Sequence, residues 1–92
     1  MLSVTLSTSA RQDLADAVEW YARHSIHNAQ RFVAEYGRME ALVAESPERW
    51  TMIKPGVRRL VFRRFPYSLI YSVQGDHVIV IAVKHHARRP GI

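Results

Sequence analysis

The sequence contains no cysteine and no apolar run of membrane-spanning length. The absence of cysteine excludes disulfide bonds and thiolate metal sites, and a membrane-spanning helix needs about 20 consecutive apolar residues. The N-terminal residues, MLSVTLSTSARQDL, also lack the charged start and the long apolar stretch of a signal peptide. We therefore expect a cytoplasmic protein that does not enter a membrane.

Common catalytic motifs are missing as well. The sequence has no glycine-rich phosphate loop, no HExxH motif and no G-x-S-x-G motif. Its acidic residues fall mainly in segments with helical periodicity, where they are typical of solvated helix faces, and they form no carboxylate pair. We expect no cofactor.

Acidic residues are also scarce in the second half of the chain. Residues 51–92 contain eight Lys and Arg residues and one acid, Asp76, whereas residues 1–50 contain five Arg residues and seven acids. The net charge of +5 is therefore concentrated in the second half. This asymmetry indicates an anionic partner, such as a nucleic acid, an acidic protein or a membrane surface. A solvated basic face that only confers solubility is the alternative.

What is present is the composition of a folded domain. The 92 residues are 48% apolar and 23% charged, which predicts one domain over residues 1–92 with a single core. Helical periodicity and alternation predict a strand at 3–7, a helix capped by Ser9, a helix at 27–45, a loop at 47–56, and strands at 58–63, 67–74 and 77–83. The Gly75-Asp76 pair is a hairpin turn between the last two strands.

The order β-α-α-β-β-β predicts the fold class. The short break between the two helices indicates a helical hairpin, and the strands form a small, mostly antiparallel sheet against which it packs. The last strand, HVIVIAV, is apolar on both faces and should be central, pairing with strand 67–74 and with the N-terminal strand. We therefore predict an α+β protein.

Arginines flank the predicted hairpin. Arg59 and Arg63 share one face of strand 58–63, whereas Arg58 and Arg64 lie on the other face at the strand ends, and Arg88 and Arg89 follow the last strand. Guanidinium groups suit carboxylate or phosphate recognition.

Aromatic residues lie among these arginines. Tyr67 and its neighbours could stack on bases, although alternating aromatics in a strand are more often core residues. Trp20 lies off the apolar stripe of the first helix, which favours a helix–helix contact over an exposed aromatic for a partner.

Two adjacent histidines, His85 and His86, end the last strand and should point to opposite faces. That geometry is poor for a shared metal ion, and we predict no metal site. One of them could act as a general acid or base, since histidine titrates near neutral pH. A structural hydrogen bond near the end of the sheet is the alternative.

The element order and the segment RRFPYSLIYSVQGDHVIVIAVKHHARRP together resemble the ParE/RelE superfamily of bacterial toxins. These are the toxin halves of type II toxin–antitoxin modules, also called plasmid stabilisation proteins. The resemblance covers nearly the whole chain. Its specific part is residues 63–90, where AVKHHARRP is similar to the family ending A-V-x-H-x-x-R-x-P.

The resemblance implies one of two activities. ParE-like members are associated with poisoning of DNA gyrase, whereas RelE-like members are ribosome-dependent endoribonucleases that cleave mRNA with cationic residues of the sheet. Here Val61 and Ser68 occupy places where a ribonuclease would use cations, and no tyrosine follows the last strand. The ParE-like function, without catalytic residues, is therefore favoured. The alternative is a ribonuclease that uses Arg63, His85 and Arg88.

The resemblance also implies partners. We expect a cognate antitoxin with an acidic segment that folds on binding, in a toxin–antitoxin hetero-oligomer, with contacts to Trp20, Arg59 and Arg63. The target, DNA gyrase or alternatively the ribosome and mRNA, is expected to contact Arg58, Arg59, Arg63, Arg64, Tyr67, His85, His86, Arg88 and Arg89. A general nucleic-acid-binding domain is a third hypothesis, although no DNA-reading motif appears.

Overall fold

In the computed structural model, which describes residues 1–87, each helix begins at a serine. The Ser7 side chain accepts a hydrogen bond from the backbone N–H of Ala10 and starts α1 (Thr8–Ala22). Ser25 does the same for α2 (Ile26–Glu45). The predicted cap at Ser9 is wrong. The Ser7 N–H donates to the Val80 carbonyl and so continues the strand pairing up to Ser7, and α1 starts at the next residue.

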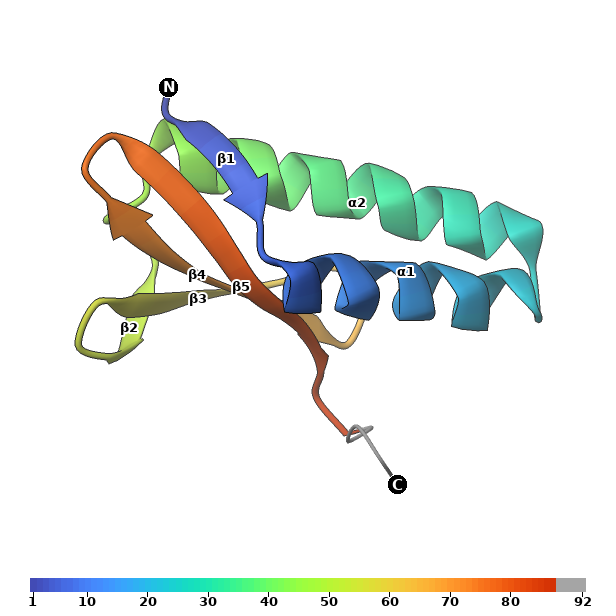
Figure 1. Cartoon of the computed structure of the whole chain (residues 1–92). Coiled ribbons are helices and arrows are strands. Elements are labelled where there is room, and N and C mark those ends of the chain that lie inside the picture. The colour runs from blue at the N-terminus through green and yellow to red at the C-terminus, as the bar shows by residue number, and fades with distance from the viewer. Residues whose placement is uncertain (88–92) are drawn as a thin grey trace.

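The two helices pack side by side on one face of a five-stranded sheet (Figure 1). The strands are β1 (Ser3–Leu6), β2 (Thr51–Lys54), β3 (Val57–Val61), β4 (Tyr67–Gln74) and β5 (His77–His85). Their order in the sheet is β1-β5-β4-β3-β2, with β1 parallel to β5 and the other neighbours antiparallel. The predicted α+β class is confirmed, and so is the pairing of the last strand with both the N-terminal strand and its hairpin partner.

The structure adds one strand to the predicted order. The segment Thr51–Lys54 was expected to be part of a loop, but it is the edge strand β2, paired antiparallel with β3. Gly56 turns the chain between them with a φ of 74°, a conformation that favours glycine. All four residues of β2 are exposed, so no alternation of apolar and polar residues marks the strand in the sequence.

A bulge in β5 decides which of its residues face the helices. Ile70 and Tyr71 are adjacent in β4, yet they pair with Ala82 and Val80 of β5, so that Ile81 is an extra residue. Because side chains alternate along a strand, an extra residue reverses the alternation after it. Val83 therefore turns into the core, where it is 3% exposed, and the residue after it turns to the opposite face.

The core lies between the sheet and the helical hairpin. A cluster of aromatic rings fills the core at the start of β4, where the Phe32 ring lies 4.9 Å from Tyr67 and 5.2 Å from Phe65. Tyr67 is 4% exposed and belongs to the core, as expected for an alternating aromatic in a strand. Within residues 1–87 no helix is both long and apolar enough to cross a membrane.

Candidate functional site

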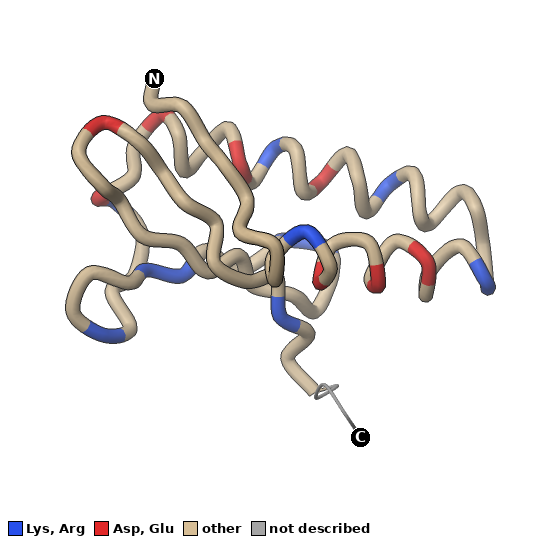
Figure 2. Tube along the Cα trace, viewed as in Figure 1, with Lys and Arg blue, Asp and Glu red and all other residues tan. Residues whose placement is uncertain are grey.

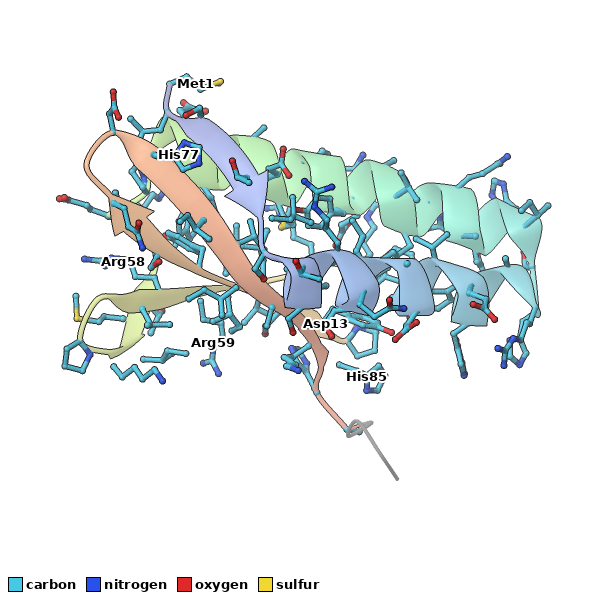
Figure 3. The ribbon with its side chains drawn as sticks, viewed as in Figure 1. Met1, Asp13, Arg58, Arg59, His77 and His85 are labelled. Carbon is cyan, nitrogen blue, oxygen red and sulfur yellow. The ribbon has the colours of Figure 1, made fainter. Side chains whose placement is uncertain are left out.

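The two adjacent arginines of β3 lie on opposite sides of the sheet (Figure 3). On the side of the helices, Arg58 Nη1 donates to the carbonyls of Glu48, at 3.0 Å, and Trp50, at 2.8 Å. This guanidinium therefore holds the connection between α2 and β2. On the other side the Arg59 side chain is exposed, and within residues 1–87 its guanidinium has no ion-pair or hydrogen-bond partner.

Arg58 also lies beside a buried phenol. It pairs in register with Tyr71, which is fully buried and whose hydroxyl donates a short hydrogen bond to the Pro47 carbonyl. Burial raises the pKa of Tyr71, while the positive charge of Arg58 acts in the opposite direction. These contacts give Arg58 a structural role and leave it poorly placed to bind a target.

The connection between β3 and β4 carries Arg63 and Arg64, which are both exposed. A buried carboxylate fixes this connection on α2, because Glu35 Oε2 accepts the backbone N–H of Arg64 at 2.7 Å. Glu35 is 1% exposed, and its other oxygen accepts Arg38 Nη2 at 3.4 Å. A buried carboxylate is tolerated when such bonds satisfy it.

The burial of Glu35 is not predicted from the sequence, because acids in an amphipathic helix are most often solvated. A signal was available, since Glu35 lies three residues after Phe32 and four before Met39, on the buried stripe of α2.

A groove of about 430 Å³ lies on the face of the sheet opposite the helices. We call it the open-face groove; its lining residues are Arg59, Val61, Ser68, Ile70, Lys84 and His86. The strand register brings them together from three strands, with Val61, Ser68 and Lys84 in one row across the sheet. Arg59 of β3 and Lys84 of β5 lie on either side of β4, which contributes Ser68 and Ile70.

The two histidines face different surroundings, as predicted. His86 Nε2 lies 2.8 Å from the Ser68 hydroxyl in the open-face groove. The His85 ring packs edge-on against Tyr67 at 5.0 Å, and its Nδ1 accepts the N–H of Ala87 at 2.9 Å. The structural alternative therefore describes His85 well. Among the described residues no three His, Cys, Asp or Glu side chains are grouped to hold a metal ion.

One carboxylate reaches the rim of the groove. Asp13 Oδ2 of α1 accepts the Val83 N–H at 3.0 Å and lies 3.7 Å from Lys84 Nζ. It thereby ties α1 to the part of β5 that extends beyond β1. Elsewhere the sheet carries mostly cations, along β2, β3 and the end of β5, whereas the helices carry both acids and arginines (Figure 2).

A second surface lies on the helical hairpin. An apolar groove of about 270 Å³ is lined mainly by Val18, Ile26, Ala29 and Val33, and two of these residues are largely exposed, Ile26 at 66% and Val33 at 50%. Trp20 is 40% exposed, and its ring contacts Tyr21 and His24, which lie one and four residues later in the chain. This surface carries apolar side chains that a partner can cover.

The predicted site residues thus separate into groups. Arg59 and His86 come together in the open-face groove, with Ser68 and Lys84, which were not selected as binding residues from the sequence. Arg88 and Arg89 lie outside the described residues.

Comparison with known proteins gives one family. A family model described as the ParE toxin of the type II toxin–antitoxin system parDE matches residues 4–90. A solved chain from the chromosomal ParDE TA system of P. aeruginosa superposes with a TM-score of 0.80 at 20% sequence identity, covering 92% of this chain and 96% of that chain. At that identity the likeness establishes a shared fold. No curated protein matches the sequence.

Proposed function

The chain belongs to the ParE toxin family of type II toxin–antitoxin systems, and from this premise we propose that it arrests bacterial growth by inhibiting DNA gyrase. The family match over residues 4–90 is the observation that carries the proposal. Gyrase acts in the cytoplasm, so the toxin acts there too.

The proposed mode of action is binding without catalysis. Binding without catalysis is supported by the positions of the residues that a ribonuclease would use, because His85 and Arg63 lie in different surroundings. His85 packs on Tyr67 and bonds to its own chain, whereas Arg63 lies on the connection that Glu35 fixes to α2. Arg88 lies outside the described residues.

The target-binding surface in this proposal is the helix-free face of the sheet. Arg59 and Lys84 present donors there beside the His86 ring, and Arg63 and Arg64 extend the basic surface from the adjoining connection. Arg58 is left out because its guanidinium is engaged by backbone carbonyls.

The cognate antitoxin is the second partner, and we place it on the helical hairpin. Ile26 and Val33 are exposed apolar residues beside the helix groove, and Trp20 adds a half-exposed aromatic. An apolar face of a folding segment would cover them, while acidic residues of the same segment would reach Arg59 or Arg63. The product is a toxin–antitoxin hetero-oligomer.

A supercoiling assay with purified gyrase tests the proposed target. We expect the toxin to inhibit supercoiling and to stabilise a gyrase–DNA cleavage complex, and we expect the antitoxin to relieve both effects. Absence of inhibition and of cleavage complex at a stoichiometric excess of toxin would refute it. In-vitro translation followed by primer extension tests the ribonuclease alternative in parallel.

A matched pair of variants locates the surface. Arg59→Gln removes a charge from the open-face groove, whereas Arg31→Gln removes the same charge from an exposed position of α2. We expect weaker gyrase inhibition from the first variant only, at unchanged thermal stability in both. Equal activity of the two variants would exclude Arg59 from the target surface.

A further inference from the structure

The open-face groove has the donors of an anion site on three neighbouring strands. Arg59 projects from β3 and Lys84 from β5, and they lie diagonally across β4, where Arg59 pairs with Ile70 and Lys84 pairs with Ser68. Neighbouring strands lie about 4.8 Å apart, so the two cationic strands are separated by roughly 10 Å. Both side chains are long enough to reach an anion above the middle strand.

Two further polar side chains line the groove, Ser68 and His86. Ser68 and His86 are hydrogen-bonded to each other through Oγ and Nε2. Within residues 1–87 the Nδ1 nitrogen of His86 has no hydrogen-bond partner, and the side chain is exposed. This nitrogen is therefore available to a ligand, and no lining residue of the groove is acidic.

We propose that the open-face groove binds a phosphodiester group of a nucleic-acid strand. A phosphate is a tetrahedral anion that accepts donors from several sides, which suits cations on opposite sides of the groove. A carboxylate is planar and is satisfied by a single guanidinium fork. A groove of about 430 Å³ is also larger than a lone anion requires.

The apolar lining residues of the groove favour a nucleic acid over free phosphate. Val61 of β3 is 46% exposed, and Ile70 lines the groove from β4, where it pairs with Arg59. These apolar side chains can contact a sugar or the face of a base next to the bound phosphate. This inference rests on the proposed function and deepens it, because the strand bound by the toxin would be the DNA that gyrase holds.

The negative charge of Asp13 lowers the affinity of the groove for an anion. Its carboxylate lies 3.7 Å from Lys84 Nζ and competes with an incoming anion for that ammonium group. The variant Asp13→Asn keeps an oxygen for the Val83 N–H but removes the charge. We therefore expect Asp13→Asn to bind the anion more tightly than the unaltered toxin.

Fluorescence anisotropy with a short labelled single-stranded oligonucleotide at low salt tests the site. We expect Arg59→Gln and Lys84→Gln each to weaken binding about tenfold and to reduce the salt dependence by about one counterion. Arg31→Gln, with the same charge change on α2, should weaken it less than twofold. Equal losses in all three variants would indicate diffuse charge attraction and overturn the proposal.

Amide chemical shifts of the full chain identify the ligand's source. We expect the oligonucleotide to shift the resonances of Ser68 and Lys84, and inorganic phosphate to shift them more weakly. A response to inorganic phosphate alone would overturn the nucleic-acid assignment. A response to a polyglutamate peptide without one to the oligonucleotide would assign the groove to acidic protein segments instead.

The same variants separate this inference from the proposed function. Full gyrase inhibition by Lys84→Gln, together with lost oligonucleotide binding, would show that the groove plays no part in inhibition. Oligonucleotide binding in the groove without any inhibition of gyrase would instead refute the proposed function and leave the site intact.

Discussion

The variant Glu35→Ala tests how the arginine-bearing connection between β3 and β4 is held. Glu35 Oε2 accepts the Arg64 N–H at 2.7 Å, and the side chain is 1% exposed. A hydrogen bond to a charged group contributes about 1.5–3 kcal/mol, and its loss also leaves a backbone donor unpaired. We expect a loss of about 2 kcal/mol, which for a domain of this size lowers the melting temperature by roughly 8–16 °C.

Two further substitutions isolate the cause of that loss. Glu35→Gln keeps an oxygen that accepts the Arg64 N–H, so it should cost about half as much. Glu45→Ala removes an exposed carboxylate from the same helix and should change stability by less than about 0.5 kcal/mol.

Thermal and urea unfolding measure the free energies of these variants, and hydrogen exchange of the Arg64 amide reports the bond itself. If Glu35→Ala unfolds at the same temperature as Glu45→Ala, or if the Arg64 amide stays protected, Glu35 does not hold this connection.

Three other predictions concern stability. Arg58→Gln should lower the free energy of unfolding in urea by about 1–2 kcal/mol, because it removes both hydrogen bonds to backbone carbonyls. Arg59→Gln should leave this free energy unchanged. Equal free energies of unfolding for the two variants would contradict the structural role of Arg58. Ser7→Ala should cost about 1 kcal/mol through loss of the helix cap, and Ser9→Ala, which alters an exposed residue inside α1, should cost much less in the same assay. Burial, with a smaller effect of the Glu40 carboxylate, raises the pKa of Tyr36. The phenol therefore ionises in the unfolded chain at a lower pH than in the folded protein. Tyr36 gives its full contribution to the free energy of unfolding below about pH 10, and that contribution falls at higher pH by up to about 1.4 kcal/mol per pH unit. Urea midpoints between neutral and strongly alkaline pH should therefore fall more steeply in the unaltered toxin than in Tyr36→Phe, and parallel curves would contradict this.

Much of the fold follows from local patterns. The apolar stripes of the helices, the Gly75-Asp76 turn and the apolar last strand predicted the hairpin and the position of β5, and all of them are present. The strand β2 was missed because its four residues are all exposed. Its conformation depends on pairing with β3, which no periodicity within the segment records.

The open-face groove was harder to predict because it depends on register. Arg59 and His86 were selected from the sequence, whereas Lys84 was not. Simple alternation along β5 from Val80 would turn Lys84 toward the helices, and the bulge at Ile81 turns it to the open face instead. The segment VIVIAV is apolar throughout, so nothing in it marks where the bulge lies.

The pairing of β1 with β5 has a consequence for the order in which the toxin forms during synthesis. Ser3 pairs with His77, 74 positions later in the chain, and β5 also contacts β4 and α1. A ribosome makes β5 last, so β1 and α1 must wait for their main partner until almost the whole protein has been made. Contacts of such long separation form slowly. A chain terminated before residue 77 would lack the strand that joins both ends, and we expect such fragments to be degraded without acting as toxins.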